Sequence, residues 1–163
     1  MIVLGIDPGL ATLGYGAVDY EKNRLKLIDY GIVTTPAGMP LPQRLKNIYD
    51  DVSALIERYG PRACAVEELF FNKNTKTALI IGHARGVAIL AAANNAVPVY
   101  EYTPLQIKQG ITGYGMAQKL QVQRMVRLLL CMDDIPKPDD AADALAAAIC
   151  CCYSESMGAA DIC

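Results

Sequence analysis

Hydrophobic and polar residues alternate along the first part of the chain in a pattern typical of β-strands. Residues 1–7 (MIVLGID) form an apolar run that ends at a Pro-Gly turn, which predicts a buried strand. Residues 14–21 and 24–35 also alternate, and only Lys22 and Asn23 separate them, which suits a tight hairpin. We therefore expect three consecutive antiparallel strands.

From residue 43 onward the period changes to that of amphipathic helices. Residues 43–60 place their apolar side chains at helical spacing and end at Gly60-Pro61, which predicts a helix. Two more short strands and four more helices are expected, the strands at 63–71 and 96–102 and the helices at 75–95, 103–115, 117–132 and from Asp139 onward. In the helix at 117–132, the side chains expected to face inward are Leu120, Val122, Met125, Val126 and Leu129.

The order of these elements is β-β-β-α-β-α-β-α-α-α, which predicts an α/β fold. We expect a five-stranded mixed sheet, a three-strand antiparallel meander plus parallel strands, flanked by helices on both faces. A chain of 163 residues is long enough for one such domain and too short for two comfortable ones. In sheets of this kind, functional sites gather beyond the carboxyl ends of the parallel strands.

The composition indicates a soluble cytoplasmic protein. We find no stretch close to the ~20 uninterrupted apolar residues of a membrane span, so no membrane association is expected. The six cysteines contain no C-x-x-C pair and the chain has one histidine, His83, so a structural zinc site is not expected. The adjacent Cys150, Cys151 and Cys152 are read as small buried hydrophobic residues in a reducing compartment.

The charges are segregated along the chain, although the net charge is only −2. Residues 72–127 hold one acid, Glu101, and seven basic side chains, whereas residues 128–163 hold seven acids and Lys137. A basic middle segment can attract a polyanion such as nucleic acid. The alternative at this point is an ordinary solvated surface.

Four carboxylates stand where burial is expected. Asp7 ends the first strand, Glu67 interrupts the strand at 63–71, and Asp140 and Asp143 share one face of the last helix at i and i+3. A desolvated carboxylate without a partner costs several kcal/mol or stays protonated. Four acids from three elements therefore suggest a site for hard divalent cations.

Ordinary explanations cover some of these acids. Acids in the first turn of a helix complement its dipole, which accounts for Asp139 and Asp140 without any function. An acid at the end of a strand is often a turn residue, which accounts for Asp7. Neither explanation suits Asp143, which an apolar run follows, or Glu67 inside an apolar strand.

Four stretches together resemble the RuvC family of Holliday-junction (crossover junction) endodeoxyribonucleases, which has an RNase H-like fold. They are GIDPGLATLGYGAV, AVEELFFNKNTKTALIIGHARGVA, QIKQGITGYGMAQKLQVQRMV and DDAADALAAAI, in the same order as in the family. The resemblance implies a nuclease domain over residues 1–153, with residues 154–163 as a flexible tail.

The resemblance implies that Asp7, Glu67, Asp140 and Asp143 are the catalytic acids and metal ligands. They would hold two Mg²⁺ ions per subunit, which Mn²⁺ can replace, one ion activating water and the other stabilising the leaving 3′ oxygen. The products would carry 5′-phosphate and 3′-hydroxyl ends. The implied function is the resolution of four-way junction DNA by paired symmetric nicks, in recombination and DNA repair.

The resemblance also implies DNA contacts. Phe70 matches the aromatic residue at the junction crossover, and Lys108 and Lys119 match positions that contact DNA. Further phosphate contacts are expected from charge alone, at Lys73, Lys76, Arg85 and Arg124. Met116 and Gln118 depart from the more polar residues that relatives often carry in this loop.

The implied partners are a second copy of the chain and the RuvA and RuvB branch-migration proteins. A C2 homodimer supplies two equivalent sites for two opposed nicks. Gly82 and Gly86, four residues apart on one helix, are a hypothetical part of that interface. Two other interpretations stay open: an actin-like ATPase module, which shares an Asp-x-Gly strand turn, and a catalytically silent nucleic-acid-binding protein of the same fold.

Overall fold

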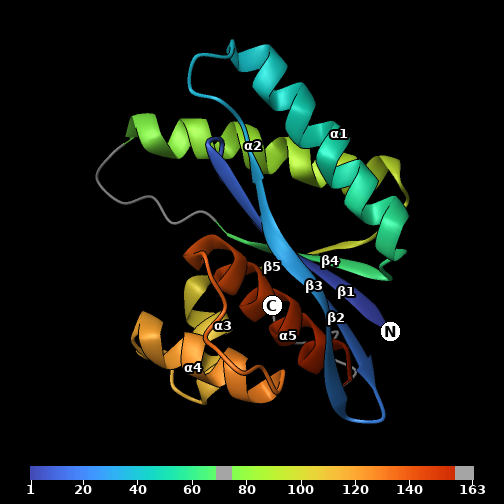
Figure 1. Cartoon of the computed structure of the whole chain (residues 1–163), viewed down its shortest axis with the longest axis vertical. Helices are drawn as coiled ribbons and strands as arrows, with labels where there is room; N and C mark the ends of the chain where they lie inside the picture. Colours follow the sequence, from blue (N-terminus) through green and yellow to red (C-terminus); the bar gives the residue numbers. More distant parts are fainter. Residues whose placement is uncertain (69–74, 157–163) are drawn as a thin grey trace.

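The computed structural model of the chain describes residues 1–68 and 75–156, and it has three layers (Figure 1). A five-stranded sheet in the order β3-β2-β1-β4-β5 lies between two helices on one face and three on the other. The strands are β1 (Ile2–Asp7), β2 (Thr12–Glu21), β3 (Arg24–Thr34), β4 (Ala63–Glu67) and β5 (Val99–Tyr102). This arrangement confirms the expected α/β fold.

The pairing of the strands confirms the antiparallel meander followed by parallel strands. β1 and β3 each pair antiparallel with β2, and Lys22 and Asn23 in the β2–β3 hairpin both have the positive φ values, 51° and 62°, that a type I′ turn requires. β4 pairs parallel with β1, and β5 with β4. Because Ile6 is opposite Val66 in this register, the next residues, Asp7 and Glu67, leave adjacent strands at the same edge of the sheet.

The five helices begin and end close to their expected positions. They are α1 (Leu41–Tyr59), α2 (Thr75–Asn94), α3 (Pro104–Thr112), α4 (Lys119–Leu129) and α5 (Asp139–Ser156). α1 ends at Gly60, which has the left-handed backbone conformation of a helix C-cap. α5 continues three residues past the expected end of the domain at residue 153. Residues 69–71, expected to continue β4, lie outside the described part of the chain.

One expectation for α4 is wrong, because Leu120 is exposed. Val122 and Val126, one turn apart, face the core and are buried. Leu120 precedes Val122 by two residues, which at 3.6 residues per turn places it on the opposite side of the helix. The apolar residues at helical spacing identify the helix, but Leu120 does not share that spacing and faces solvent.

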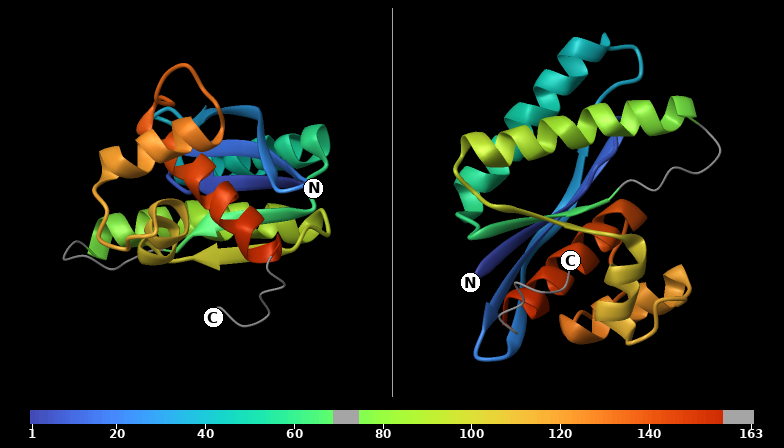
Figure 2. Two further views of the ribbon diagram at one scale, coloured as in Figure 1. Left: turned by 90° about the horizontal axis from the view of Figure 1, so that it is seen from below. Right: turned by 180° about the vertical axis from the view of Figure 1, so that it is seen from behind.

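Both faces of the sheet are buried. Leu4, Ile6 and Val66 point to the face covered by α1 and α2, whereas Val3 and Ala65 point to the face covered by α5. Figure 2 shows these two helical layers on opposite sides of the sheet. Cys150, Cys151 and Cys152 are buried residues of α5, and burial raises the pKa of each thiol. The described cysteines are free thiols, as expected for small buried hydrophobic residues.

α5 lies unusually close to the sheet because glycines on β1 and β2 face it. A Cβ atom at Gly5 would collide with the backbone carbonyl of Ala144, and one at Gly14 with that of Asp140. The residues of α5 that face the sheet are themselves small and fully buried, as at Ala141 and Ala148. Glycine on the strands and alanine on the helix therefore fix the height of α5 above β1 and β2.

α2 differs from the expectation that no segment is apolar enough to span a membrane. Among the described residues, Thr77–Asn94 is the one stretch of helix whose length and composition would permit it, and 22% of this stretch is buried. A core helix of a soluble protein can have the same composition, and α2 buries Ala84, Ala88, Ala91 and Ala92 against the sheet and α1. Much of its remaining surface is apolar and uncovered.

The close approach of α5 predicts that Gly5→Ala lowers the free energy of unfolding by about 2–3 kcal/mol, because the added methyl group meets helix backbone that cannot move aside cheaply. Chemical denaturation measures the change. Gly38→Ala is the control, since a Cβ there would meet no atom within 4 Å. Equal stability of the two variants would contradict the role assigned to Gly5.

Candidate active site at the carboxyl ends of β1 and β4

The fold brings together the four acids that the sequence singled out. Asp7 and Glu67 are the last residues of the adjacent parallel strands β1 and β4. Asp140 and Asp143 lie in the first turns of α5, where the helix passes over the same edge of the sheet. The backbone of Asp140 rests on Gly14, which is paired with Asp7 across β1 and β2.

Burial and mutual repulsion prevent this group from holding its full negative charge easily. Burial, and then the charges of Glu67, Asp143 and Asp140, raise the pKa of Asp7 to about 7. Burial and the charge of Asp143 raise the pKa of Glu67, also to about 7. Burial raises the pKa of Asp143 as well, although the hydrogen bond from Lys119 opposes this shift. The group therefore favours either protons or cations near neutral pH.

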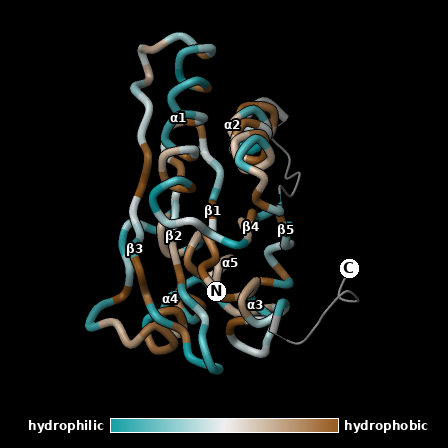
Figure 3. The backbone as a smooth tube through the Cα atoms, turned by 90° about the vertical axis from the view of Figure 1, so that its right-hand side faces the viewer, coloured by the Kyte–Doolittle hydropathy of each residue, from teal (hydrophilic) through white to brown (hydrophobic). Residues whose placement is uncertain are grey.

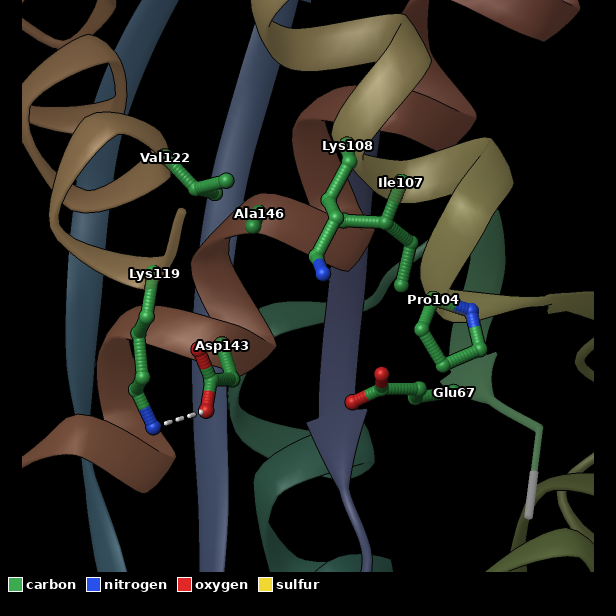
Figure 4. Close-up of a pocket in the computed structure, with 8 residues that line it drawn as sticks. All are labelled: Glu67, Pro104, Ile107, Lys108, Lys119, Val122, Asp143 and Ala146. Carbon is green, nitrogen blue, oxygen red and sulfur yellow. Dashed lines mark hydrogen bonds and ion pairs between the residues drawn. The ribbon is translucent and has the colours of Figure 1, made fainter. Parts of the chain in front are cut away.

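Lys119 is the one cation that contacts these acids among the described residues. Its Nζ atom lies 2.8 Å from Oδ2 of Asp143 (Figure 4). The same Nζ atom lies 3.2 Å from Oδ2 of Asp139. Burial lowers the pKa of Lys119, but the hydrogen bonds and charges of these two aspartates outweigh burial and raise it. The side chain of Gln123 donates a 3.0 Å hydrogen bond to Oδ1 of Asp139, and this bond, with Lys119, lowers the pKa of Asp139.

The sequence interpretation missed the role of Asp139 and Gln123. The sequence pattern predicts only that Asp139 complements the helix dipole, and it predicts no role for Gln123. Lys119 and Gln123 are four residues apart on α4, as are Asp139 and Asp143 on α5, so each pair lies on one helical face. This matched spacing was the available signal, but it becomes informative only when the two helices are known to be neighbours.

A small cavity opens beside the acids. It measures about 240 Å³, and its polar lining consists of Glu67 and Asp143 with Lys108 and Lys119. Figure 4 shows the Glu67 carboxylate and the Lys108 ammonium directed toward the same space. The rest of the lining is apolar and comes from Pro104, Ile107, Val122 and Ala146. An anionic group that enters this cavity meets two ammonium groups and, next to them, the carboxylates.

The donor set fits hard divalent cations in its chemistry. Carboxylate oxygens are the ligands that Mg²⁺ and Mn²⁺ prefer, and a cation between these acids would offset the burial and the repulsion that raise the pKa values of Asp7 and Glu67. Within residues 1–68 and 75–156, no three acidic, histidine or cysteine side chains are placed so that they could bind one metal ion together. One of the four acids, Asp143, is engaged by Lys119 instead.

The residues expected to contact DNA fall into different surroundings. Lys108 and Lys119 line the cavity, and Arg124 is exposed on α4. Arg85 forms an ion pair with Glu101 of β5, and only 20% of its side chain is exposed, so its guanidinium is already paired with an acid inside the fold, although its buried Nε has no hydrogen-bond partner among the described residues. Phe70 and Lys73 lie outside the described residues, as does the side chain of Lys76 at the start of α2.

Exposed apolar residues follow α3, close in sequence to the cavity lysines. Tyr114 and Met116, in the connection from α3 to α4, are 61% and 72% exposed. The expectations drawn from the sequence included Met116 only as a departure from the family pattern, and did not include Tyr114.

Comparisons with known proteins agree on one family. The family model described as crossover junction endodeoxyribonuclease RuvC matches residues 3–151. The crossover junction endodeoxyribonuclease RuvC of Alkaliphilus oremlandii is 61% identical over 150 residues, which are 92% of this chain and 92% of that protein. That of Caldanaerobacter subterraneus is 57% identical over 157 residues, or 96% of this chain and 95% of its own.

Solved structures give the same result. Thermus thermophilus RuvC has a TM-score of 0.91 at 38% identity, and the same protein in complex with a Holliday junction substrate has a TM-score of 0.89 at 36% identity, each match covering 97% of both chains. The yeast mitochondrial Holliday junction resolvase, at 14% identity and a TM-score of 0.65, shares the fold. The chain belongs to the RuvC family of crossover junction endodeoxyribonucleases.

Proposed function

We propose that this chain resolves Holliday junctions by paired symmetric nicks, through phosphodiester hydrolysis assisted by two metal ions. The observation that carries the proposal is the group of four carboxylates at the ends of β1 and β4 and on α5, in which the raised pKa values of Asp7, Glu67 and Asp143 call for positive charge. Dependence on a divalent metal follows from family membership. The same membership argues against the actin-like ATPase and the silent binding protein.

Asp7, Glu67, Asp140 and Asp143 are the residues that would hold the metal ions. Mg²⁺ is the proposed metal, with two ions per subunit and Mn²⁺ as a substitute; when bound, they would supply an activated water and stabilise the leaving 3′ oxygen. Lys108 and Lys119 would neutralise the scissile phosphate from the cavity wall. The apolar side chains of Ile107 and Val122 would limit the access of bulk water to that phosphate.

The DNA-binding surface that we propose extends outward from this cavity. It includes Lys108, Lys119 and Arg124, together with Phe70, Lys73 and Lys76 from the segment around the start of α2. Arg85 is left out because Glu101 already pairs with it. Phosphate contacts made by lysine and arginine release counterions, so binding should weaken steeply as salt rises.

We also propose that two copies form a C2 dimer through α2. Leu79, Ile80 and Leu90 are exposed large hydrophobic residues on this helix, and a Cβ at Gly86 would meet no atom within 4 Å. Figure 3 shows hydrophobic residues along α2 at the outside of the molecule. Gly86 faces open space rather than the core, which suits a close approach by a second copy. The RuvA and RuvB proteins are proposed partners in the cytoplasm by family resemblance.

The proposed chemistry predicts that Asp7→Asn reduces cleavage of a four-way junction in Mg²⁺ by about a thousandfold or more while junction binding is retained. Cleavage is measured on denaturing gels and binding by gel shift in Ca²⁺. Glu68→Gln, one residue past Glu67, is the matched control and should cleave within a fewfold of the unmodified chain. Full activity of the Asp7 variant would overturn the nuclease mechanism proposed for this site.

The raised pKa values predict that stability without metal falls as pH rises. Asp7 and Glu67 have ordinary pKa values of 3.8 and 4.5, and about 7 in the folded chain. Between about pH 4 and pH 7 the unfolded chain loses these protons first, so deprotonation favours unfolding. Asp7→Asn should therefore stabilise the protein at pH 8, by about 1–3 kcal/mol, and much less at pH 4.

Thermal unfolding in EDTA at pH 4 and pH 8 measures this difference. Added Mg²⁺ should stabilise the unmodified protein at pH 8 more than the Asp7 variant, because the cation relieves the repulsion between the acids. A lower Tm for the variant than for the unmodified protein at pH 8 would show that the Asp7 carboxylate stabilises the metal-free fold, contrary to this prediction.

The dimer proposal predicts that Leu90→Glu converts the protein to monomers, because a charge would be buried in the interface. Light scattering measures the mass. Leu128→Glu is the control, since Leu128 is similarly exposed but lies on α4. The Leu90 variant should also nick the two strands of a junction independently instead of together. A dimer that persists with both variants would exclude the exposed face of α2 as the interface.

A further inference from the structure

Four side chains, two from each helix, connect α4 to α5 beside the acids. Lys119 of α4 contacts both Asp139 and Asp143 of α5, and Gln123, one turn further along α4, donates to Asp139. We call these four residues the α4–α5 clamp. Of these four residues, only Asp143 is an inferred metal ligand. The clamp therefore connects one inferred metal ligand to α4, a helix that carries no inferred metal ligand.

The geometry points to a role for the clamp that depends on the proposed function. Lys119 acts as an internal cation that occupies Asp143 until DNA binds. Asp139, which Gln123 orients, is the positioning residue that holds Lys119 in place. In this arrangement the Lys119 ammonium and a divalent cation compete for the same carboxylate oxygen. A DNA phosphate then withdraws Lys119 and frees Asp143 for the metal.

The contact distances support competition for Asp143. The 2.8 Å separation between Nζ and Oδ2 of Asp143 is that of a charge-assisted hydrogen bond, which takes up a lone pair that a metal ion would need. The same described residues place no three potential ligands around one point. An engaged Asp143 accounts for that lack of convergence, because it is turned toward α4 while Asp7 and Glu67 belong to the sheet.

The exposure of the clamp supports its release. The Lys119 side chain is 50% exposed and that of Asp143 28%, so the ammonium group lies at the open side of the cavity. Lysine is a point charge on a flexible four-carbon stem, which allows Nζ to move to a phosphate without any movement of α4. Asp139, at 65% exposure, is the second anchor, which keeps Lys119 beside α5.

A lysine that is shared in this way couples metal binding to DNA binding. If DNA removes Lys119 from Asp143, the affinity for the metal rises, and the metal must increase the affinity for DNA by the same factor. The enzyme would then load its metals mainly when a substrate phosphate is present. Lys108 lines the same cavity and makes no ion pair among the described residues, so the same coupling is not expected of it.

The first test measures Mn²⁺ binding to DNA-free protein from the electron paramagnetic resonance signal of free Mn²⁺. Lys119→Met should bind Mn²⁺ roughly fivefold to tenfold more tightly than the unmodified chain. Lys108→Met removes the same charge from the cavity, but Lys108 acts on Glu67 through its charge alone, so the gain in affinity should be clearly smaller, about twofold at most. An unchanged or weaker affinity in Lys119→Met, or an equal gain in Lys108→Met, would overturn the proposal.

Asp139→Asn gives an independent arm that does not remove Lys119 or any inferred ligand. Loss of the second anchor should loosen Lys119 and tighten Mn²⁺ binding about twofold to threefold. A general charge effect acts in the opposite direction, because this substitution removes a negative charge near the metal. Weaker Mn²⁺ binding by Asp139→Asn would therefore overturn the positioning role of Asp139.

The second test measures the coupling from the DNA side, by fluorescence anisotropy of a labelled four-way junction in Ca²⁺ and in EDTA. Ca²⁺ should improve junction binding by a larger factor in the unmodified chain than in Lys119→Met, and a denaturing gel confirms that the junction stays intact. Equal factors would overturn the clamp. Junction cleavage by the unmodified chain in Mg²⁺ is assayed separately, so a failure of the proposed function is distinguishable from a failure of the clamp.

Discussion

The close packing of α5 on β1 and β2 is the constraint on which the proposed active site depends. Gly5 and Gly14 leave no side chain between the strands and the helix, so the backbone of Asp140 rests directly on β2. Asp7 is opposite Gly14 in the same ladder. A larger residue at Gly14 would lift the helix away from the strand ends, and the acids of α5 would no longer share an electrostatic environment with Asp7 and Glu67.

This packing places like charges together at a cost to the fold. Carboxylates that are desolvated within one group stabilise the protein only when protons or cations accompany them. Asp7 and Glu67 satisfy this condition through pKa values near 7, and Asp143 through Lys119. The metal-free site is therefore poised between protonation, an internal cation and external metal ions, and small changes in its surroundings change which of these it holds.

Much of this architecture could be predicted from the sequence because it depends on local pattern. The apolar runs located β1 and β4, and the parallel order of these strands then placed Asp7 and Glu67 at one edge. Leu120 was misplaced because an apolar residue need not face the core: it precedes Val122 by two residues, which puts it on the opposite side of the helix. The ion pairs of Arg85 with Glu101 and of Lys119 with Asp139 were not predictable, since each joins residues of different elements that only the fold brings together.

The basic segment of the sequence therefore holds two kinds of positive charge, one available to DNA and one paired with acids inside the fold, and the sequence alone could not separate them. The basic segment at 72–127 contacts the acidic segment at 128–163 where α4 packs beside α5. There Lys119 forms ion pairs with Asp139 and Asp143. Part of the positive charge that appeared available to DNA is thus internal counter-charge. In the mechanism we propose, Lys119 belongs to both sets, because it can bind a carboxylate or a phosphate but not both fully, and this dual use would link substrate recognition to the availability of the inferred metal ligand Asp143.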